Sequence, residues 1–151
     1  MNLCIREAKL EEAELIIRYQ IEMAKESEGM TLDPARVEPG VNAVFRDPSK
    51  GQYFVALLDD VVIGCTLIQY EWSDWRNRTV LWIHSLYVTP LHRGKGVFRA
   101  IYDLLKKRVA GSQALGGIRL YVDQRNETAI SAYEKIGMTR EHYHLYEWMK
   151  P

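Results

Sequence analysis

Cysteine is scarce in this chain, neither sign of charge is in excess, and no apolar run reaches the length of a membrane span. The two cysteines, Cys4 and Cys65, lie in apolar, strand-like stretches. We expect buried free thiols in a reducing cytoplasm rather than a disulfide framework. Twenty basic residues balance twenty acidic ones, which excludes a general attraction to nucleic acid or to an anionic membrane. No signal-peptide pattern is found either.

The length of 151 residues, with 47% hydrophobic residues, fits one globular domain over residues 1–151 with a sizeable core. Apolar periodicity predicts a mixed α/β protein with the order β-α-α-β-β-β-α-β-α-β. In the first helix the predicted buried stripe is Leu10, Ala13, Ile17, Ile21 and Ala24. Pro39 and Gly40 are expected to bend or restart the second helix. The expected strands cover 2–7, 53–58, 61–70, 79–88, 118–122 and 142–149, and the expected helices cover 10–25, 34–45, 97–109 and 126–137, with a polar connection at 71–78.

A basic, glycine-rich turn, Arg93-Gly94-Lys95-Gly96, stands between the strand ending at Val88 and the next helix. This layout directs backbone N–H groups and the positive end of a helix dipole at one point, which suits a phosphate or a pyrophosphate. The turn lacks the spacing of a P-loop and the third glycine of a dinucleotide fingerprint. A plain turn that merely begins a helix is the alternative reading.

A second pattern runs from Asn126 to Gly137. Asn126 is a good helix N-cap, and Gly137 is a good helix end. Ala129 and Tyr133 are one helical turn apart and share a face. Taken alone, the segment is also consistent with a core tyrosine and a routine glycine cap.

Together these segments resemble the GCN5-related N-acetyltransferase (GNAT) family over roughly residues 53–149. Arg93, Gly96 and Phe98 fall on the family pattern Gln/Arg-x-x-Gly-x-Gly/Ala, with Phe98 in place of the small residue. Asn126 to Met138 is similar to the second segment with which that family contacts CoA. The resemblance implies the GNAT-like acyl-CoA N-acyltransferase fold, acetyl-CoA as co-substrate and direct attack of a primary amine on the thioester.

The resemblance also implies roles for individual residues. Tyr133 would protonate the leaving thiolate, and a backbone N–H near Leu86 would stabilise the oxyanion. His84 stands where many relatives carry a glutamate, and its ordinary pKa of about 6.5 suits a base, although a structural histidine, or Glu71, Asp74 or Glu147 as the base, are alternatives. The implied acetyl-CoA contacts are Leu86, Tyr87, Val88, Arg93, Gly94, Lys95, Gly96, Val97, Phe98, Arg99, Asn126, Ala129 and Tyr133.

Two tryptophans and two acids in one short connection indicate a site for an amine cation. The candidate acceptor residues are Glu71, Trp72, Asp74, Trp75 and, from the last strand, Tyr143; a loop anchored by tryptophan with solvated charges is the alternative. His142 and His144 lack a third ligand at a telling spacing, so we expect no metal. The expected partner is a small cationic amine, and related proteins are often homodimers. The alternative function is a non-catalytic acyl-CoA sensor or interaction module of the same fold.

Overall fold

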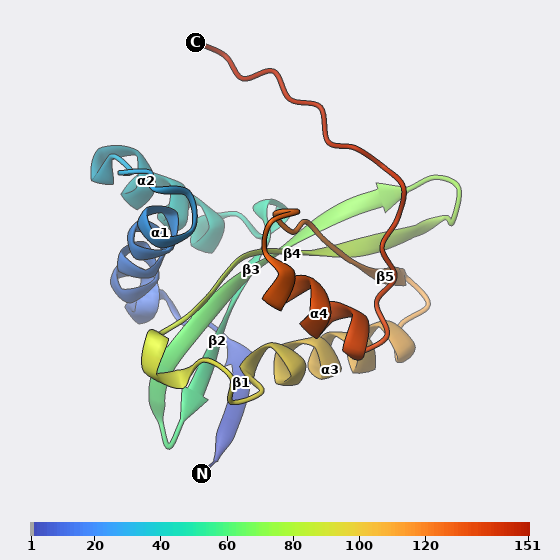
Figure 1. Ribbon diagram of the computed structural model, residues 1–151, viewed down its shortest axis with the longest axis horizontal. Coiled ribbons are helices and arrows are strands. Elements are labelled where there is room, and N and C mark those ends of the chain that lie inside the picture. Colours follow the sequence, from blue (N-terminus) through green and yellow to red (C-terminus); the bar gives the residue numbers. More distant parts are fainter. Residues whose placement is uncertain (1) are drawn as a thin grey trace. The chain divides into compact units, whose positions relative to one another are not determined.

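The computed structural model describes residues 2–151. The chain divides into two compact units, one ending at Tyr121 and the other running from Val122 to Pro151. The first unit is a mixed sheet in the order β1-β2-β3-β4-β5, antiparallel except for the parallel pair β4 and β5 (Figure 1). Its strands are β1 (Leu3–Glu7), β2 (Gln52–Leu58), β3 (Val61–Ser73), β4 (Arg78–Val88) and β5 (Leu115–Leu120).

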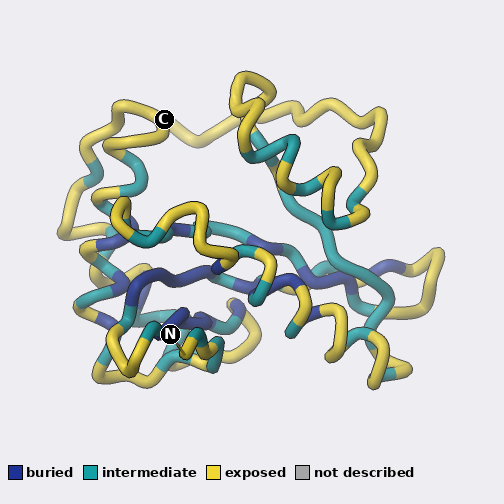
Figure 2. Tube along the Cα trace, turned by 60° about the horizontal axis from the view of Figure 1, so that its bottom comes forward, coloured by how far each residue is buried: buried dark blue, intermediate teal, exposed yellow. Residues whose placement is uncertain are grey.

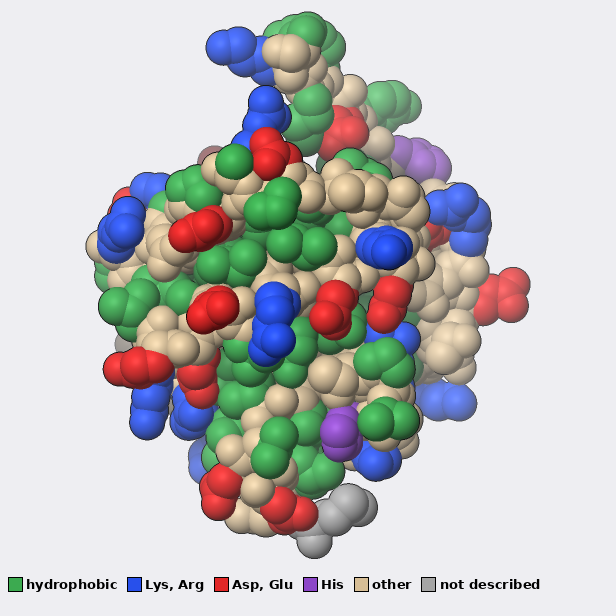
Figure 3. Space-filling model, turned by 90° about the vertical axis from the view of Figure 1, so that its left-hand side faces the viewer, with side chains coloured by type: hydrophobic (Ala, Val, Ile, Leu, Met, Phe, Trp, Pro, Cys, Tyr) green, Lys and Arg blue, Asp and Glu red, His purple; other side chains and the backbone are tan. Residues whose placement is uncertain are grey.

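Helices cover both faces of this sheet. On one face α3 (Val97–Ala110) packs Ile101 and Leu105 against Leu81 and Ile83 of β4. On the other face α1 (Ala13–Glu28) and α2 (Pro34–Arg46) pack against β2, the first half of β3 and Tyr87. The central strands are therefore the most deeply buried part of the unit (Figure 2). The face that carries α1 and α2 mixes acidic and basic side chains (Figure 3), in keeping with the balanced composition.

The first helix begins later than its sequence pattern indicates. Leu10–Glu12 form a 3₁₀ turn, so the α-helical phase starts at Ala13, and Leu10 is 62% exposed. The fully buried residues of α1 are Ala13, Ile16, Tyr19 and Gln20. Of the predicted stripe, Ala13 is buried and Ile17 packs against the same core, but Leu10 was wrong, because the 3₁₀ turn takes it out of the α-helical phase.

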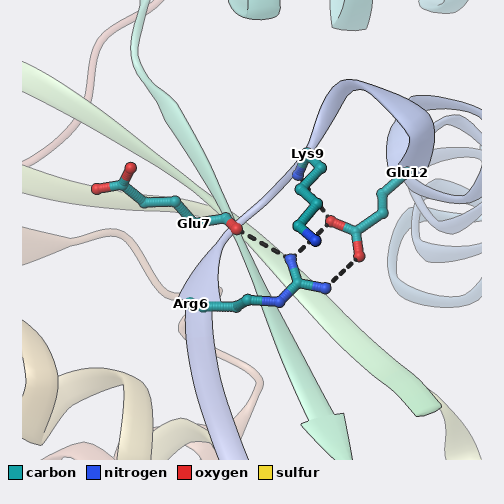
Figure 4. Close-up of polar contacts among 4 residues, drawn as sticks. All are labelled: Arg6, Glu7, Lys9 and Glu12. Carbon is teal, nitrogen blue, oxygen red and sulfur yellow. Dashed lines mark hydrogen bonds and ion pairs between the residues drawn. The ribbon is translucent and has the colours of Figure 1, made fainter. Parts of the chain in front are cut away.

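A polar cluster fixes the connection between β1 and α1 (Figure 4). The Arg6 guanidinium donates two hydrogen bonds to the Glu12 carboxylate, at 3.0 and 2.6 Å, and one to the Glu7 carbonyl. Glu12 also accepts from the Lys9 backbone N–H at 2.7 Å. The hydrogen bond from Arg6 lowers the pKa of Glu12, so the carboxylate stays charged and holds the first turn in place.

The second helix runs through Pro39 and Gly40 as one element, so the predicted restart does not occur. The predicted cap is confirmed, because Asp33 accepts from the Ala35 N–H at 3.0 Å. Both cysteines are free. Cys65 is buried, which raises its pKa to about 12, whereas Cys4 is exposed on edge strand β1, so its predicted burial was wrong.

Cross-strand pairing lengthens the strand predicted over 61–70 and moves the strand predicted over 118–122 toward the N-terminus. Glu71 and Trp72 pair with Val80 and Thr79, so the connection between β3 and β4 shrinks to the turn 74–77. Gly116 and Gly117 lie inside β5, which ends at Leu120. Pairing with a long neighbour overrides the polar or glycine-rich composition in both places.

The second unit contains α4 (Glu127–Lys135). Its predicted caps are confirmed: Asn126 Oδ1 accepts from the Ala129 N–H at 3.1 Å, and Gly137 has a φ of +92°. The predicted strand at 142–149 was wrong, because no described strand pairs with this segment. Its apolar residues, such as Leu145 and Trp148, are exposed; a strand needs a partner as well as an alternating sequence.

Candidate active site

Strand β4 has an unpaired edge near its end. Its pairing with β5 stops at Ile83 opposite Leu120. From His84 to Val88, only β3 pairs with it among the described strands. The backbone N–H and C=O groups on the β5 side of this stretch can therefore bind an extended ligand in the manner of an added strand.

A β-bulge lies at the start of that edge. Leu67 pairs with His84 and Cys65 with Tyr87, so the single residue Thr66 faces both Ser85 and Leu86. Ser85 has a φ of +51°, a conformation uncommon for a non-glycine residue. The buried Thr66 hydroxyl donates to the His84 carbonyl at 2.9 Å and fixes the bulge. Bulges of this kind redirect backbone groups next to active sites.

The glycine-rich turn follows at the carboxyl end of β4, as the sequence predicts. Gly94 and Gly96 have φ values of +72° and +82°. Apart from the adjoining residues of the chain, no atom would lie within 4 Å of a Cβ at either position. Glycine is thus needed there for its backbone conformation, and it leaves the space in front of the turn clear.

Helix α3 starts at this turn without a side-chain cap, because its N-cap is Gly96. Its hydrogen-bond ladder begins with the Ala100 N–H, which donates to the Gly96 carbonyl at 3.0 Å. The amides of the first turn precede the ladder and point along the helix axis, where they suit an anion.

The side chains around the turn divide into two groups. Lys95 and Arg99 are exposed, and Arg99 also lies 3.7 Å from Asp103. Phe98 instead packs against the core beneath α3 and stacks with Tyr102 at 6.2 Å between ring centroids. The Phe98 ring is thus partly buried against that core and is not directed at the turn's backbone amides alone.

His84 lies on the sheet face that α1 and α2 cover in part. Its ring stacks with Trp82 at 5.8 Å between centroids and meets Tyr121 edge-on at 6.0 Å. Burial lowers the pKa of His84 below its ordinary value. The imidazole is therefore neutral at physiological pH and can accept a proton.

The candidate acceptor residues separate in the structure. Glu71 lies on the same sheet face as Trp82, and it pairs with Arg119 of β5 at 2.5 Å. Trp72 projects from the opposite face, as strand alternation requires. In the turn, Asp74 accepts from the Trp75 N–H, and the Trp75 side chain is 89% exposed. Only Glu71 of these four shares a face with His84.

The second unit holds the remaining predicted residues. Ala129 and Tyr133 lie one turn apart on α4. Burial raises the pKa of Tyr133, so its phenol stays protonated at neutral pH. Tyr143 is exposed and stacks with His142 at 4.6 Å between centroids.

The sequence alone does not mark Thr66 and Tyr121 as neighbours of His84, or Arg119 as a neighbour of Trp82 and Glu71. These contacts arise only through strand register, and no local motif indicates them. Among residues 2–151, no three potential metal ligands come together. The same residues include no helix that is long and apolar enough to cross a membrane.

Comparison with known proteins agrees with this geometry. Residues 14–138 match the Acetyltransferase (GNAT) family. The chain is 27% identical over 131 residues to the streptothricin acetyltransferase of Escherichia coli, covering 85% of this chain and 72% of the relative.

Two solved structures share the fold. A possible acetyltransferase from Clostridium difficile 630 superposes with a TM-score of 0.90 at 36% identity, over 100% of this chain and 99% of the other. A predicted acetyltransferase from Clostridium acetobutylicum, solved with acetyl-CoA, has a TM-score of 0.75 at 16% identity, over 97% and 96%.

The chain therefore belongs to the acetyltransferase (GNAT) family. The mixed sheet, with helices on both faces, is the acyl-CoA N-acyltransferase fold of those neighbours. The family membership that the sequence motifs indicate and the predicted fold class are both confirmed.

Proposed function

We propose that this protein transfers an acetyl group from acetyl-CoA to a primary amine of a small, cationic acceptor. The observation that carries the proposal is the unpaired edge of β4, which leads directly into the turn at Gly94 and Gly96. An acyl-CoA needs both features, because its pantetheine arm carries amides and its diphosphate is anionic.

The donor side follows from the backbone. The β4 edge from Leu86 to Val88 offers hydrogen bonds to the pantetheine amides, and the first turn of α3 offers N–H groups to the diphosphate. Lys95 adds positive charge at that point. In the second unit, Asn126 uses its Oδ1 atom to cap α4, which leaves its side-chain NH₂ to donate to the pantetheine arm. Ala129, on the same helix, is proposed as a second contact.

The chemical step is aminolysis of a thioester. The amine nitrogen attacks the acetyl carbonyl carbon, and a backbone N–H near Leu86 stabilises the oxyanion. The C–S bond then breaks, and the Tyr133 phenol gives its proton to the departing thiolate. His84 takes the proton that the amine nitrogen loses, directly or through water. The products are an acetamide and CoA with a free thiol.

The acceptor assignment rests on aromatic rings beside the proposed base. Trp82, Tyr121 and His84 gather within 6.0 Å of one another by ring centroids, and aromatic faces attract ammonium groups. Glu71 lies on the same face and adds negative charge, although Arg119 pairs with it. The name of the Escherichia coli relative, a streptothricin acetyltransferase, also favours a small-molecule acceptor.

The test begins with a calorimetric titration of the purified protein with acetyl-CoA, using ATP as a control that also carries phosphates. We expect micromolar binding of acetyl-CoA alone. A panel of small amines is then assayed for release of free CoA thiol. Absence of acetyl-CoA binding would overturn the proposal, and binding without turnover of any amine would favour the non-catalytic sensor.

A further inference from the structure

Arg93, the first residue of the glycine-rich motif, turns its side chain back toward α1. Its Nη2 atom pairs with Glu26 of α1 at 2.5 Å. Its Nε–H donates to the Val88 carbonyl at 2.8 Å. The Arg93 guanidinium at the start of the turn thus contacts both the last residue of β4 and Glu26 of α1, which lies 67 residues earlier in the sequence.

Tyr87 contacts both Arg93 and α1. The Arg93 guanidinium lies 5.6 Å from the centre of the Tyr87 ring, within the range of a cation–π contact. The Tyr87 side chain is 4% exposed, and its hydroxyl donates to Glu22 at 2.7 Å. Burial and the bond to Glu22 raise the pKa of Tyr87, so the phenol remains a neutral donor.

Glu22 and Glu26 are one helical turn apart and share a face of α1. Through Tyr87 and Arg93 they hold the end of β4 and the first residue of the turn. We call Glu22, Glu26, Tyr87 and Arg93 the α1 clasp. It positions the backbone immediately before Gly94, where the chain enters a left-handed conformation.

We propose that Arg93 is a positioning residue that holds the phosphate-binding turn from behind and does not itself bind the diphosphate. Its Nε–H and one Nη2–H are committed to Val88 and Glu26, and the carboxylate of Glu26 offsets its charge. The affinity for the diphosphate then comes from the backbone amides and Lys95. This inference rests on the proposed function, because it concerns how acetyl-CoA is held.

The two roles of Arg93 predict opposite effects for Glu26→Gln. If Arg93 positions the turn, loss of the ion pair loosens the turn, and acetyl-CoA binds about fivefold more weakly, the upper range for a half-exposed ion pair. If Arg93 binds the diphosphate, Glu26 competes for it, and Glu26→Gln binds acetyl-CoA more tightly. Calorimetry distinguishes these signs. Glu28→Gln is the matched control, because it removes the same charge from the same end of α1.

A charge exchange gives the second readout. Arg93→Glu and Glu26→Arg should each raise the KM for acetyl-CoA, while the KM for the amine stays unchanged. The double variant restores an ion pair between positions 26 and 93. If the α1 clasp positions the turn, this variant regains much of the lost affinity for acetyl-CoA. If Arg93 instead binds the diphosphate, the double variant cannot regain the affinity for acetyl-CoA, because residue 93 then carries a negative charge.

Two results would overturn the α1 clasp and leave the proposed function standing. One is that Glu26→Gln binds acetyl-CoA more tightly than Glu28→Gln does. The other is that the double variant binds acetyl-CoA no more tightly than Arg93→Glu does. Failure of the wild-type protein to bind acetyl-CoA would instead overturn the proposed function, and this inference with it.

Discussion

Gly96 offers a direct test of the proposed phosphate-binding turn. It is the N-cap of α3 with a φ of +82°, and a Cβ built there has no other atom within 4 Å. Gly96→Ala therefore meets no steric clash within the protein. The substitution strains the backbone and fills part of the space in front of the first-turn amides, where we place the diphosphate.

The expected loss of stability is small. A left-handed conformation costs alanine roughly 1–2 kcal/mol, and the reduced entropy of the unfolded chain returns about 0.4–1 kcal/mol. The net loss in the free energy of unfolding is about 1 kcal/mol, which lowers the Tm by about 2–4 °C in a chain of this length. The affinity should fall further, by at least about tenfold or 1.4 kcal/mol, because the methyl group blocks close approach of the diphosphate to the amides.

Gly29→Ala is the matched control. Gly29 ends α1 with a φ of +63°, and a Cβ there would likewise meet no atom within 4 Å beyond the adjoining residues. Both variants are compared by thermal unfolding and by calorimetric titration with acetyl-CoA. We expect similar losses of Tm and a loss of affinity in Gly96→Ala alone. Equal affinities in both variants would refute the assignment of the turn.

Three further variants test the chemistry. Because burial lowers the pKa of His84, kcat/KM should fall only as the pH drops below about 6.5. His84→Gln should remove this fall at acidic pH. An unaltered pH profile would direct the search for the base to Glu71 or Asp74. Tyr133→Phe should reduce turnover by roughly a hundredfold with acetyl-CoA affinity unchanged; unaffected turnover would remove Tyr133 from the mechanism. Arg119→Gln should leave Glu71 unpaired and lower the KM for a cationic acceptor severalfold, with less than about 1 kcal/mol lost in stability; no change in that KM would place Glu71 outside the acceptor site.

The parts of the site that depend on local chain chemistry could be predicted from the sequence. The turn at Gly94 and Gly96 follows from the residues that permit a positive φ. The cap at Asn126 follows from a side chain that bonds to its own helix. Neither depends on a segment distant in the sequence, and the structure shows both.

Features created by pairing between distant segments could not be predicted in the same way. Arg119 and Tyr121 reach Trp82 and His84 only through the register of β5 on β4. Glu26 meets Arg93 only because α1 packs on that face of the sheet. The alternating sequence at 142–149 marks a segment able to form a strand, but it does not provide the neighbouring strand that would make one.

The bulge at Ser85 shows why register matters for function. In a regular strand Trp82, His84, Leu86 and Val88 would share one face, and Tyr87 would share the other with Ile83. The bulge exchanges these faces beyond His84: Leu86 and Val88 pack with the core beneath α3, and Tyr87 turns toward α1, where it meets Tyr19 and Glu22. Ser85 keeps an unfavourable φ of +51° because both cores depend on it. The same bulge lies where β4 parts from β5, so one irregularity supplies the edge proposed for acetyl-CoA, the position of His84 beside it, and the attachment of the α1 clasp.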